Sequence, residues 1–446
     1  SSVTGVQTCA LPISMLERTD AMDRLWHARA IAAPYAEHLS EADRIAGLSL
    51  FWSEAKYNFA HFNNVPGLDW DQAYLDFLPQ VIAAADTRAY YEVLMRFAPL
   101  LHDGHTNINP PKELQAHFYA RPPLGTALID GKVLVTFVGS DRLAKQGIRV
   151  GDEITAIDGI EVKRYAQERV APYESGSTPQ DMAVRMYSYA LLAGDKDVPL
   201  KLDLDDGHGH RRTLVVARDG YADRRSPPSF VFRQLPGGVA YLSLDQFETK
   251  ASSEAFMQHL PQIMQAKALI LDVRRNGGGS DSYGFQILSR LTAAPIPGPR
   301  STELSVDPVA RANGNLTLEW LQLDGSGASY PHHTSPIFTG PVAVLTSART
   351  FSAAEDFVMT FDALKRGILV GQRTGGSTGM PMAFTLPGGG SARICVKWDS
   401  YPDGREFVGQ GIAPDVEVAP TIADIRQGRD PVIARAADLL RAKLKR

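Results

Sequence analysis

The chain has 446 residues, too many for one ordinary core, so two or three domains are expected. Hydrophobic residues make up 44% and charged residues 22%, which is typical of a globular protein, and the net charge is −4. Without a basic stripe, no nucleic-acid partner is expected. The two cysteines exclude a disulfide framework and a thiolate metal site. The sequence contains no run of eighteen apolar residues, so no membrane span is predicted.

The first fourteen residues need separate treatment. Their sequence, SSVTGVQTCALPIS, resembles the translation of a sequencing adapter, so residues 1–14 are interpreted as an adapter-derived artefact that is not part of the fold. The stretch has no basic start, and its apolar run is too short for a signal peptide. We therefore expect that the natural N-terminus, together with any signal peptide, is missing from this sequence.

Residues 15–112 carry a helical pattern. Apolar residues recur at helical spacing in Asp43–Phe62, and Trp70–Ala85 and Tyr90–Leu101 follow the same period. Pro-Gly and Asp-Thr turn signals separate the three segments. We predict an N-terminal helical bundle that ends at the sequence LLHDGHTNINPP.

Residues 113–222 change to a period of two, which is typical of strands. We predict strands at Val133–Val138 and Asp152–Val162, and a hairpin over Leu200–Arg218. The run LAKQGIRVGDEITAIDGIEV resembles the core of a PDZ domain, with its short helix, its Gly-Asp turn and its tight Asp-Gly turn. An unrelated small β-domain is the alternative for this region.

Residues 223–446 alternate strands with helices, which predicts an α/β layered domain around a largely parallel sheet. Ala268–Val273 is a continuous apolar run, as expected of a strand buried on both faces. The strands are predicted at 238–247, 268–273, 341–347, 367–371 and 392–398, and the helices at 252–265, 281–293 and 352–365. The segment Pro299–Gly340 has little regular pattern, and its length suggests a lid or a substrate-binding surface.

The segment VLTSARTFSAAEDF leads from a buried strand into a helix that opens at Ser352. A serine there lies beyond the carboxyl end of the sheet, among the free backbone N–H groups of the helix start. The motif Ser352-Ala-Ala-Glu355 also fits a capping box, in which Ser352 is only the N-cap and Glu355 bonds back to it. The segment alone leaves catalysis and capping open.

The segment DVRRNGGGSD ends a strand in three glycines. Glycine lets backbone N–H groups approach a ligand closely, and such a turn can stabilise the oxyanion of a tetrahedral intermediate. A phosphate-binding loop is the rival interpretation, but it needs a Lys-Ser/Thr pair where Ser280-Asp281 stands. An anion hole is the better fit.

The segment LLHDGHT carries two histidines, His102 and His105. They could form a metal pair, as could His332 and His333, but no second pair and no HExxH-type spacing accompanies them. We therefore predict no metal site.

Together, the three motifs resemble the carboxyl-terminal-processing (tail-specific) and tricorn family of serine peptidases. The most specific parts of the resemblance are LDVRRNGGGSD, VLTSARTFSAAEDF, LVGQRTGG and VGQGIAPDVEV. It implies an α/β multidomain fold: an N-terminal helical domain, a PDZ-like domain, and a catalytic α/β domain related to the crotonase and Clp protease fold. It also implies peptide hydrolysis without an organic cofactor.

The resemblance assigns the nucleophile to Ser352 and the oxyanion donors to the backbone N–H groups of Ala353 and Gly278. Tail-specific members activate the serine with a lysine after a Thr-x-Gly turn, but Ser377 stands there in this chain. A Ser–Lys dyad is therefore not expected unless Lys365 or Lys397 reaches the site from elsewhere. Tricorn-like members use a histidine from the segment before the PDZ domain, and His105 matches it as the general base.

The carboxylate that orients this histidine is harder to assign. The family places a glutamate in a strand where this chain has Val408. Glu406 lies two residues earlier, on the same face of a strand, so we predict that it is the substitute, with Asp103 as the second candidate. Tricorn members carry a serine just before the histidine, where this chain has Gly104.

The sequence therefore predicts a serine endopeptidase that acts on peptides or unfolded proteins and binds them through its PDZ-like domain. A non-catalytic binding protein on the same scaffold, as in the retinoid-binding relatives, is one alternative. An esterase-type hydrolase that uses the same serine is the other. Because relatives are frequently exported in bacteria, a periplasmic or secreted location is favoured.

Overall fold

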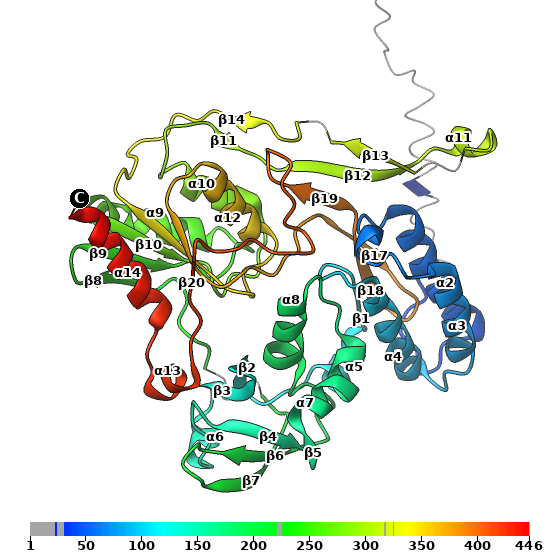
Figure 1. The fold of residues 1–446 in the computed structure, drawn as a ribbon. Helices are drawn as coiled ribbons and strands as arrows, with labels where there is room; N and C mark the ends of the chain where they lie inside the picture. Colours follow the sequence, from blue (N-terminus) through cyan, green and yellow to red (C-terminus); the bar gives the residue numbers. More distant parts are fainter. Residues whose placement is uncertain (1–22, 25–30, 221–224, 316–317, 324, 446) are drawn as a thin grey trace, which may run out of the picture.

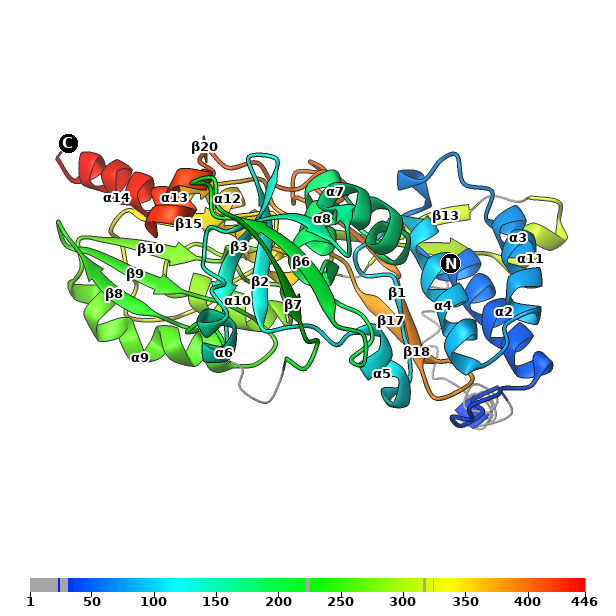
Figure 2. The ribbon, with the colours of Figure 1, turned by 90° about the horizontal axis from the view of Figure 1, so that it is seen from below.

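The structure is a computed structural model that describes residues 23–24, 31–220, 225–315, 318–323 and 325–445. The adapter-like stretch 1–14 lies outside the described residues. Figure 1 shows three regions: an α/β domain, a helical region at its far side, and a β-domain beneath them. Figure 2, seen from below, shows the β-domain crossing the junction between the other two.

The helical region contains the three predicted helices, α2 (Glu41–Asn58), α3 (Trp70–Ile82) and α4 (Thr87–Phe97). Each begins at an N-cap side chain, Ser40, Asp69 or Asp86, that accepts a hydrogen bond from the third residue of the helix. Short 3₁₀ turns, η1 (Phe62–Asn64) and η2 (Ala98–Leu101), follow α2 and α4. The prediction of a helical bundle is confirmed.

A small antiparallel sheet completes the helical region. Its strands are β1 (Asn107–Asn109), β18 (Ser391–Cys395) and β17 (Pro381–Thr385), in the order β1-β18-β17. The prediction that residues 392–398 belong to the parallel sheet is wrong. The apolar side chains Ala392, Ile394 and Cys395 instead pack into the core of the helical region, whose helices lie much earlier in the chain.

The β-domain has a sheet in the order β2-β3-β4-β6-β7, with every pairing antiparallel. The predicted hairpin over Leu200–Arg218 is confirmed as β6 and β7. The strands are β2 (Leu124–Ile129), β3 (Lys132–Val138), β4 (Glu153–Ile157), β5 (Ile160–Glu161, paired with β4), β6 (Leu200–Asp205) and β7 (Arg211–Val216). The helical segments are α5 (Lys112–Phe118), α6 (Asp141–Lys145), α7 (Val162–Tyr165), η3 (Ala166–Val170), η4 (Ala171–Tyr173), α8 (Pro179–Val184) and η5 (Arg185–Ala190).

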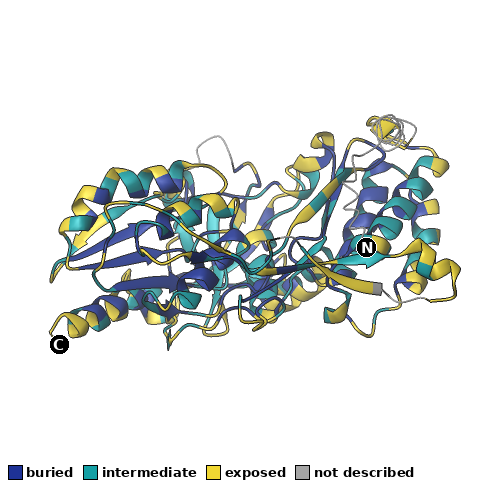
Figure 3. Ribbon diagram, turned by 90° about the horizontal axis from the view of Figure 1, so that it is seen from above, coloured by how far each residue is buried: buried dark blue, intermediate teal, exposed yellow. Residues whose placement is uncertain are grey.

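The α/β domain is built on a sheet in the order β20-β16-β15-β10-β9-β8. All neighbours are parallel except β8 and β9, so the predicted largely parallel sheet is confirmed. The strands are β8 (Phe232–Leu235), β9 (Val239–Ser243), β10 (Ala268–Asp272), β15 (Val342–Thr346), β16 (Ile368–Gly371) and β20 (Val416–Glu417). Figure 3 shows this sheet buried between helices that expose their outer faces.

Alternate side chains of the sheet face two different cores. Leu269 and Leu271 of β10 contact the layer of α9 (Ala251–Gln265), α10 (Asp281–Leu288) and α12 (Ala353–Ala363). Ala268 and Ile270 contact α14 (Pro431–Leu444), which follows the short helix α13 (Ile422–Gln427). Strands buried on both faces explain the continuous apolar runs of the sequence.

The segment Pro299–Gly340 is more regular than predicted. Strands β12 (Arg300–Val306) and β13 (Leu318–Gln322) pair antiparallel, β19 (Lys397–Ser400) adds to β12, and α11 (Pro308–Ala312) lies between β12 and β13. Two short strands, β11 (Ile296–Pro297) and β14 (Ser329–Tyr330), pair at its base. The segment forms an arm that reaches from the α/β domain to the helical region (Figure 1).

Among the described residues, no helix combines the length and the apolar character that a membrane crossing needs.

Candidate active site

Ser352 lies in the turn between β15 and α12, at the carboxyl end of the parallel sheet. Its backbone has φ +55° and ψ −131°, a strained conformation for a residue with a side chain. The backbone N–H donates to the Ser377 carbonyl at 3.0 Å, and the side chain makes no capping hydrogen bond. The capping interpretation of Ser352 is therefore wrong.

His105 lies in the loop between η2 and β1, in a region far from Ser352 in sequence. Folding brings its Nε2 to 2.9 Å from the Ser352 Oγ, a hydrogen-bond distance. The imidazole stacks on the Phe351 ring, with centroids 4.8 Å apart. The predicted serine and histidine therefore meet, and the neighbouring aromatic ring fixes the plane of the imidazole.

The other ring nitrogen of His105 bonds to a serine that was not predicted to act. His105 Nδ1 lies 3.0 Å from the Ser377 Oγ. With the proton on Nδ1, the imidazole donates to Ser377 and Nε2 is free to accept from Ser352. Ser377 stands at the position where tail-specific members carry their lysine, which was the one sequence signal that marked it.

Glu355 holds Ser377 in place. Its carboxylate accepts hydrogen bonds from the Thr374 hydroxyl at 2.6 Å, the Gly376 N–H at 2.7 Å and the Ser377 N–H at 2.8 Å. Complete burial raises the pKa of Glu355 to about 7, although these hydrogen bonds act in the opposite direction. The sequence had suggested that Glu355 is a capping residue; the structure instead uses it to fix the turn behind the imidazole.

Glu406 is not the orienting carboxylate in this structure, so that prediction is wrong. The side chain is exposed, and its Oε2 accepts a hydrogen bond from the Trp398 indole at 2.7 Å. Both nitrogens of the His105 ring already bond to hydroxyls. The expected strand around Glu406 does not form, since this region has only an isolated bridge to Ser400.

Asp103 supports the loop rather than the ring. Its Oδ2 accepts from the His105 backbone N–H at 3.2 Å and from the Thr106 hydroxyl at 2.6 Å, while Oδ1 lies 3.1 Å from His61 Nδ1. Burial opposes ionisation, yet the bond from His61 and the other donors keep the pKa of Asp103 below its usual range. Asp103 thus positions the main chain of His105.

His61, Asp103 and Cys395 are the one set of metal-capable side chains that converge among the described residues. His61 is already engaged, since Nδ1 bonds to Asp103 and Nε2 lies 3.1 Å from the Lys397 carbonyl. The histidine pairs considered from sequence, 102 with 105 and 332 with 333, do not converge with further ligands in this part of the chain. The three buried groups form a hydrogen-bonded support behind the catalytic loop.

The glycine turn lies against Ser352, as predicted. Gly278 has φ +98°, and a Cβ added to it would lie 2.6 Å from the Ser352 Cβ. Its N–H, however, donates to Asn276 Oδ1 at 2.9 Å, whereas no hydrogen bond within the described residues uses the Ala353 N–H. The Ala353 N–H is therefore available to a ligand, whereas the Gly278 N–H is engaged by Asn276.

The environment keeps His105 neutral. Burial lowers the pKa of His105 to about 3; the Asp103 charge opposes this shift, and Arg393 and Arg185 add to it. A neutral imidazole leaves Nε2 able to accept a hydrogen bond from the Ser352 hydroxyl. The lysines considered as alternative bases are engaged elsewhere: Lys365 lies 2.8 Å from Asp362, and Lys397 lies 3.0 Å from Asp399.

Gly104 departs from the serine of tricorn-like members for a steric reason. A Cβ at this position would lie 2.7 Å from Arg185 Nη2 and 2.8 Å from the Phe351 ring. Arg185 also donates to the Gly104 carbonyl at 3.1 Å. The arginine therefore occupies the space beside the loop that a serine side chain would need.

Asp272 and Arg274, to which no catalytic role was assigned, form an ion pair of 2.6 Å, and Arg274 also pairs with Asp430 at 2.8 Å.

Comparison with known proteins agrees with this geometry. Residues 238–418 match the model of Peptidase family S41, a range that includes the glycine turn, Ser352 and Ser377. This part of the chain belongs to peptidase family S41. The S41 segment thus supplies the hydroxyls of the site, while His105 comes from outside it.

Two relatives support the same assignment at low identity. A tricorn protease homologue of Streptomyces coelicolor is 27% identical over 449 residues, which cover 93% of this chain and 33% of that protein. The Carboxyl-terminal-processing protease of a Picosynechococcus species is 28% identical over 293 residues, or 65% of this chain and 60% of that protein. This chain spans only about a third of the length of the Streptomyces relative.

A solved structure shows that the fold extends beyond the S41 segment. Mature CPAF in complex with lactacystin superposes with a TM-score of 0.70 at 16% identity, covering 91% of this chain and 98% of that one. At this identity the match concerns the fold alone.

Removing the Ser377 hydroxyl tests the support of the imidazole. In Ser377→Ala, His105 Nδ1 loses its partner, and we expect kcat to fall about 10- to 100-fold with KM nearly unchanged. Steady-state kinetics on a peptide substrate measure kcat and KM separately. Ser377→Thr keeps a hydroxyl and should recover most of the activity; equal kcat in Ser377→Ala and the wild type would contradict this role.

The raised pKa of Glu355 predicts a pH dependence of stability. Between its ordinary value of 4.5 and about 7, the folded chain holds a proton that the unfolded chain has lost, so stability falls as pH rises through this window. Glu355→Gln should make the pH dependence of the unfolding free energy less steep, by up to about 1.4 kcal/mol per pH unit. Urea unfolding at pH 5, 6 and 7 measures it, with Glu406→Gln as the exposed control. Parallel curves for the wild type and Glu355→Gln would refute the prediction.

Proposed function

We propose that this chain is a serine peptidase that hydrolyses peptide bonds through an acyl-enzyme formed on Ser352. The observation that carries the proposal is the 2.9 Å contact between the Ser352 Oγ and His105 Nε2. This contact supports the proposal because a hydroxyl and an imidazole lie within proton-transfer distance, at the start of a helix beside a glycine turn.

The chemical steps follow from these positions. Ser352 Oγ bonds to the carbonyl carbon of the substrate while its proton passes to His105 Nε2. The Ala353 N–H stabilises the oxyanion, and the Gly278 N–H joins it once released by Asn276. His105 then gives the proton to the leaving amine as the peptide C–N bond breaks. A water molecule, deprotonated by His105, then attacks the ester carbon; as the ester C–O bond breaks, His105 returns the proton to the Ser352 Oγ and the carboxylic acid product leaves.

We assign the β-domain the delivery of extended substrate as a PDZ-like module. β2 is an edge strand, and a cavity of about 220 Å³ lies between it and η5. The cavity is lined by residues of β2, by Tyr189 and by Arg349, three residues before the nucleophile. A peptide added to the edge of β2 would gain main-chain hydrogen bonds and lie beside the segment that leads to Ser352.

A fluorophosphonate probe tests the nucleophile directly. We expect it to label the wild-type chain at Ser352, with the modified residue identified by peptide mass spectrometry, and to leave Ser352→Ala unlabelled. Casein turnover should vanish in the same variant. Failure of the wild type both to label and to cleave would leave a binding protein on this scaffold, and labelling with ester but not amide turnover would indicate an esterase.

A further inference from the structure

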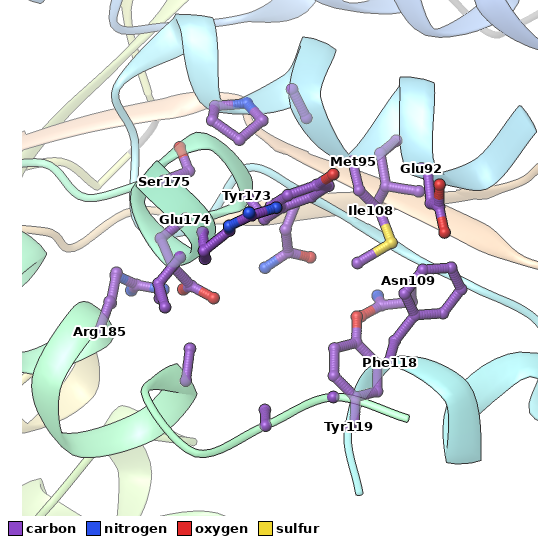
Figure 4. A pocket seen from close by; sticks show the side chains of 18 of the residues that line it. Glu92, Met95, Ile108, Asn109, Phe118, Tyr119, Tyr173, Glu174, Ser175 and Arg185 are labelled. Carbon is purple, nitrogen blue, oxygen red and sulfur yellow. The ribbon is translucent and has the colours of Figure 1, made fainter. Parts of the chain in front are cut away.

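A cavity of about 330 Å³ lies outside the site described above, between the helical region and the β-domain. It is walled by α4 and β1 on one side and by the segments from α7 to η5 on the other, and neither Ser352 nor His105 lines it. Figure 4 shows side chains from both regions converging on the same space. Its size suits a small organic molecule.

Glu174 places a carboxylate in this cavity without a partner. No hydrogen bond within the described residues reaches its oxygens, and Figure 4 shows them directed into the open space. Burial raises the pKa of Glu174 to about 7, although the Arg185 charge opposes the shift. A half-buried carboxylate that receives no hydrogen bond from the described residues can gain one from a ligand.

The cations in the walls are already committed. Arg185 donates to Asp181 Oδ1 at 3.0 Å and to the Gly104 carbonyl at 3.1 Å. Arg88 pairs with Asp195 at 3.0 Å and with Glu92 at 3.2 Å. Arg169 lines the rim but is exposed. Arg185 therefore acts on Glu174 through its charge but forms no ion pair with it among the described residues, which leaves the carboxylate available to a bound cation.

The rest of the lining favours a cation with an apolar body. Tyr119 faces Glu174 across the cavity, and the Glu174 charge contributes, after burial, to raising the pKa of Tyr119 to about 12. Met95, Phe118 and Tyr173 supply apolar and aromatic surface. Aromatic faces beside a carboxylate are a favourable environment for an ammonium group.

From this arrangement, we infer that the cavity is a binding site for an organic ammonium ion, with the Glu174 carboxylate as its counter-ion and the aromatic lining around its body. The same chemistry is offered by a free amine and by the amino terminus of a peptide. The inference stands on the cavity and does not depend on peptide hydrolysis.

Isothermal titration calorimetry tests the inference with benzylamine, and with phenylalaninamide as a mimic of a peptide amino terminus. Both should bind the wild-type chain at least about tenfold more tightly than their neutral counterparts, benzyl alcohol and N-acetylphenylalaninamide. Tighter binding of phenylalaninamide than of benzylamine indicates a peptide amino terminus, and the reverse order indicates a free amine. Equal affinity for the charged and neutral compounds overturns the inference.

Variants locate the site. Glu174→Gln should weaken benzylamine about tenfold or more, while Glu168→Gln, an exposed carboxylate on the neighbouring turn η3 outside the lining, should not change it. Arg169→Ala should leave binding equal or tighter. Unchanged affinity in a folded Glu174→Gln variant would refute the assignment; should this variant fail to fold, the comparison of charged and neutral compounds on the wild type decides.

Discussion

Replacing His105 by glutamine should reduce kcat for peptide hydrolysis by about 10⁴- to 10⁶-fold. The glutamine amide can bond to both neighbouring hydroxyls but cannot accept a proton near neutral pH. Since the position is 3% exposed, bulk water has little access to it and is a poor substitute for the imidazole as a base. Steady-state kinetics and active-site titration measure the loss.

The adjacent histidine provides the control for this experiment. His102 belongs to the same LLHDGHT segment but is exposed, so His102→Gln should keep wild-type kcat. Thermal unfolding of both variants shows that the fold is retained. Activity of His105→Gln within about tenfold of the wild type would mean that another group deprotonates Ser352.

Gly278→Ala should reduce kcat/KM by about 10³-fold and lower the free energy of unfolding by about 2 kcal/mol. The residue has φ +98°, which disfavours any side chain, and the new Cβ would lie 2.6 Å from the Ser352 Cβ and 2.8 Å from the Phe351 carbonyl. The backbone of the turn therefore has to move away from the nucleophile, and the oxyanion donors move with it.

The neighbouring glycine is the matched control. A Cβ on Gly277 would meet no atom within 4 Å, so Gly277→Ala should leave both stability and kcat/KM nearly unchanged. Urea unfolding measures the free energy of unfolding of the two variants, and peptide kinetics measure their kcat/KM. Both variants carry the same glycine-to-alanine change, one residue apart. Similar behaviour of the two variants would show that the turn does not shape the oxyanion pocket.

The α/β domain could be predicted because its signals are local. The apolar run Ala268–Val273 indicates a strand buried on both faces, and β10 ends within one residue of the predicted bounds. The strand β18 could not be placed in the same way. Its apolar pattern reports burial but not the partner, and it pairs with β1, whose residues lie far earlier in the chain.

In the candidate site too, local patterns could be interpreted but contacts between distant segments could not. Ser352 and His105 were predicted from a family resemblance, since no spacing connects residues 247 positions apart. Glu355 was misread because Ser-x-x-Glu is also a capping motif, and the local pattern does not contain the turn 374–377 that uses its carboxylate. Ser377 was noted only as the place of a missing lysine, although a hydroxyl there can hold the imidazole.

The distance along the chain between the imidazole and the hydroxyl also bears on biosynthesis. Translation makes His105 first, and the strand β18 that pairs with its neighbour Asn107 is made after Ser352. A nascent chain released before that strand therefore lacks the β1–β18 pairing that anchors the His105 loop. We expect the contact between His105 and Ser352 to form only once β18 has been synthesised.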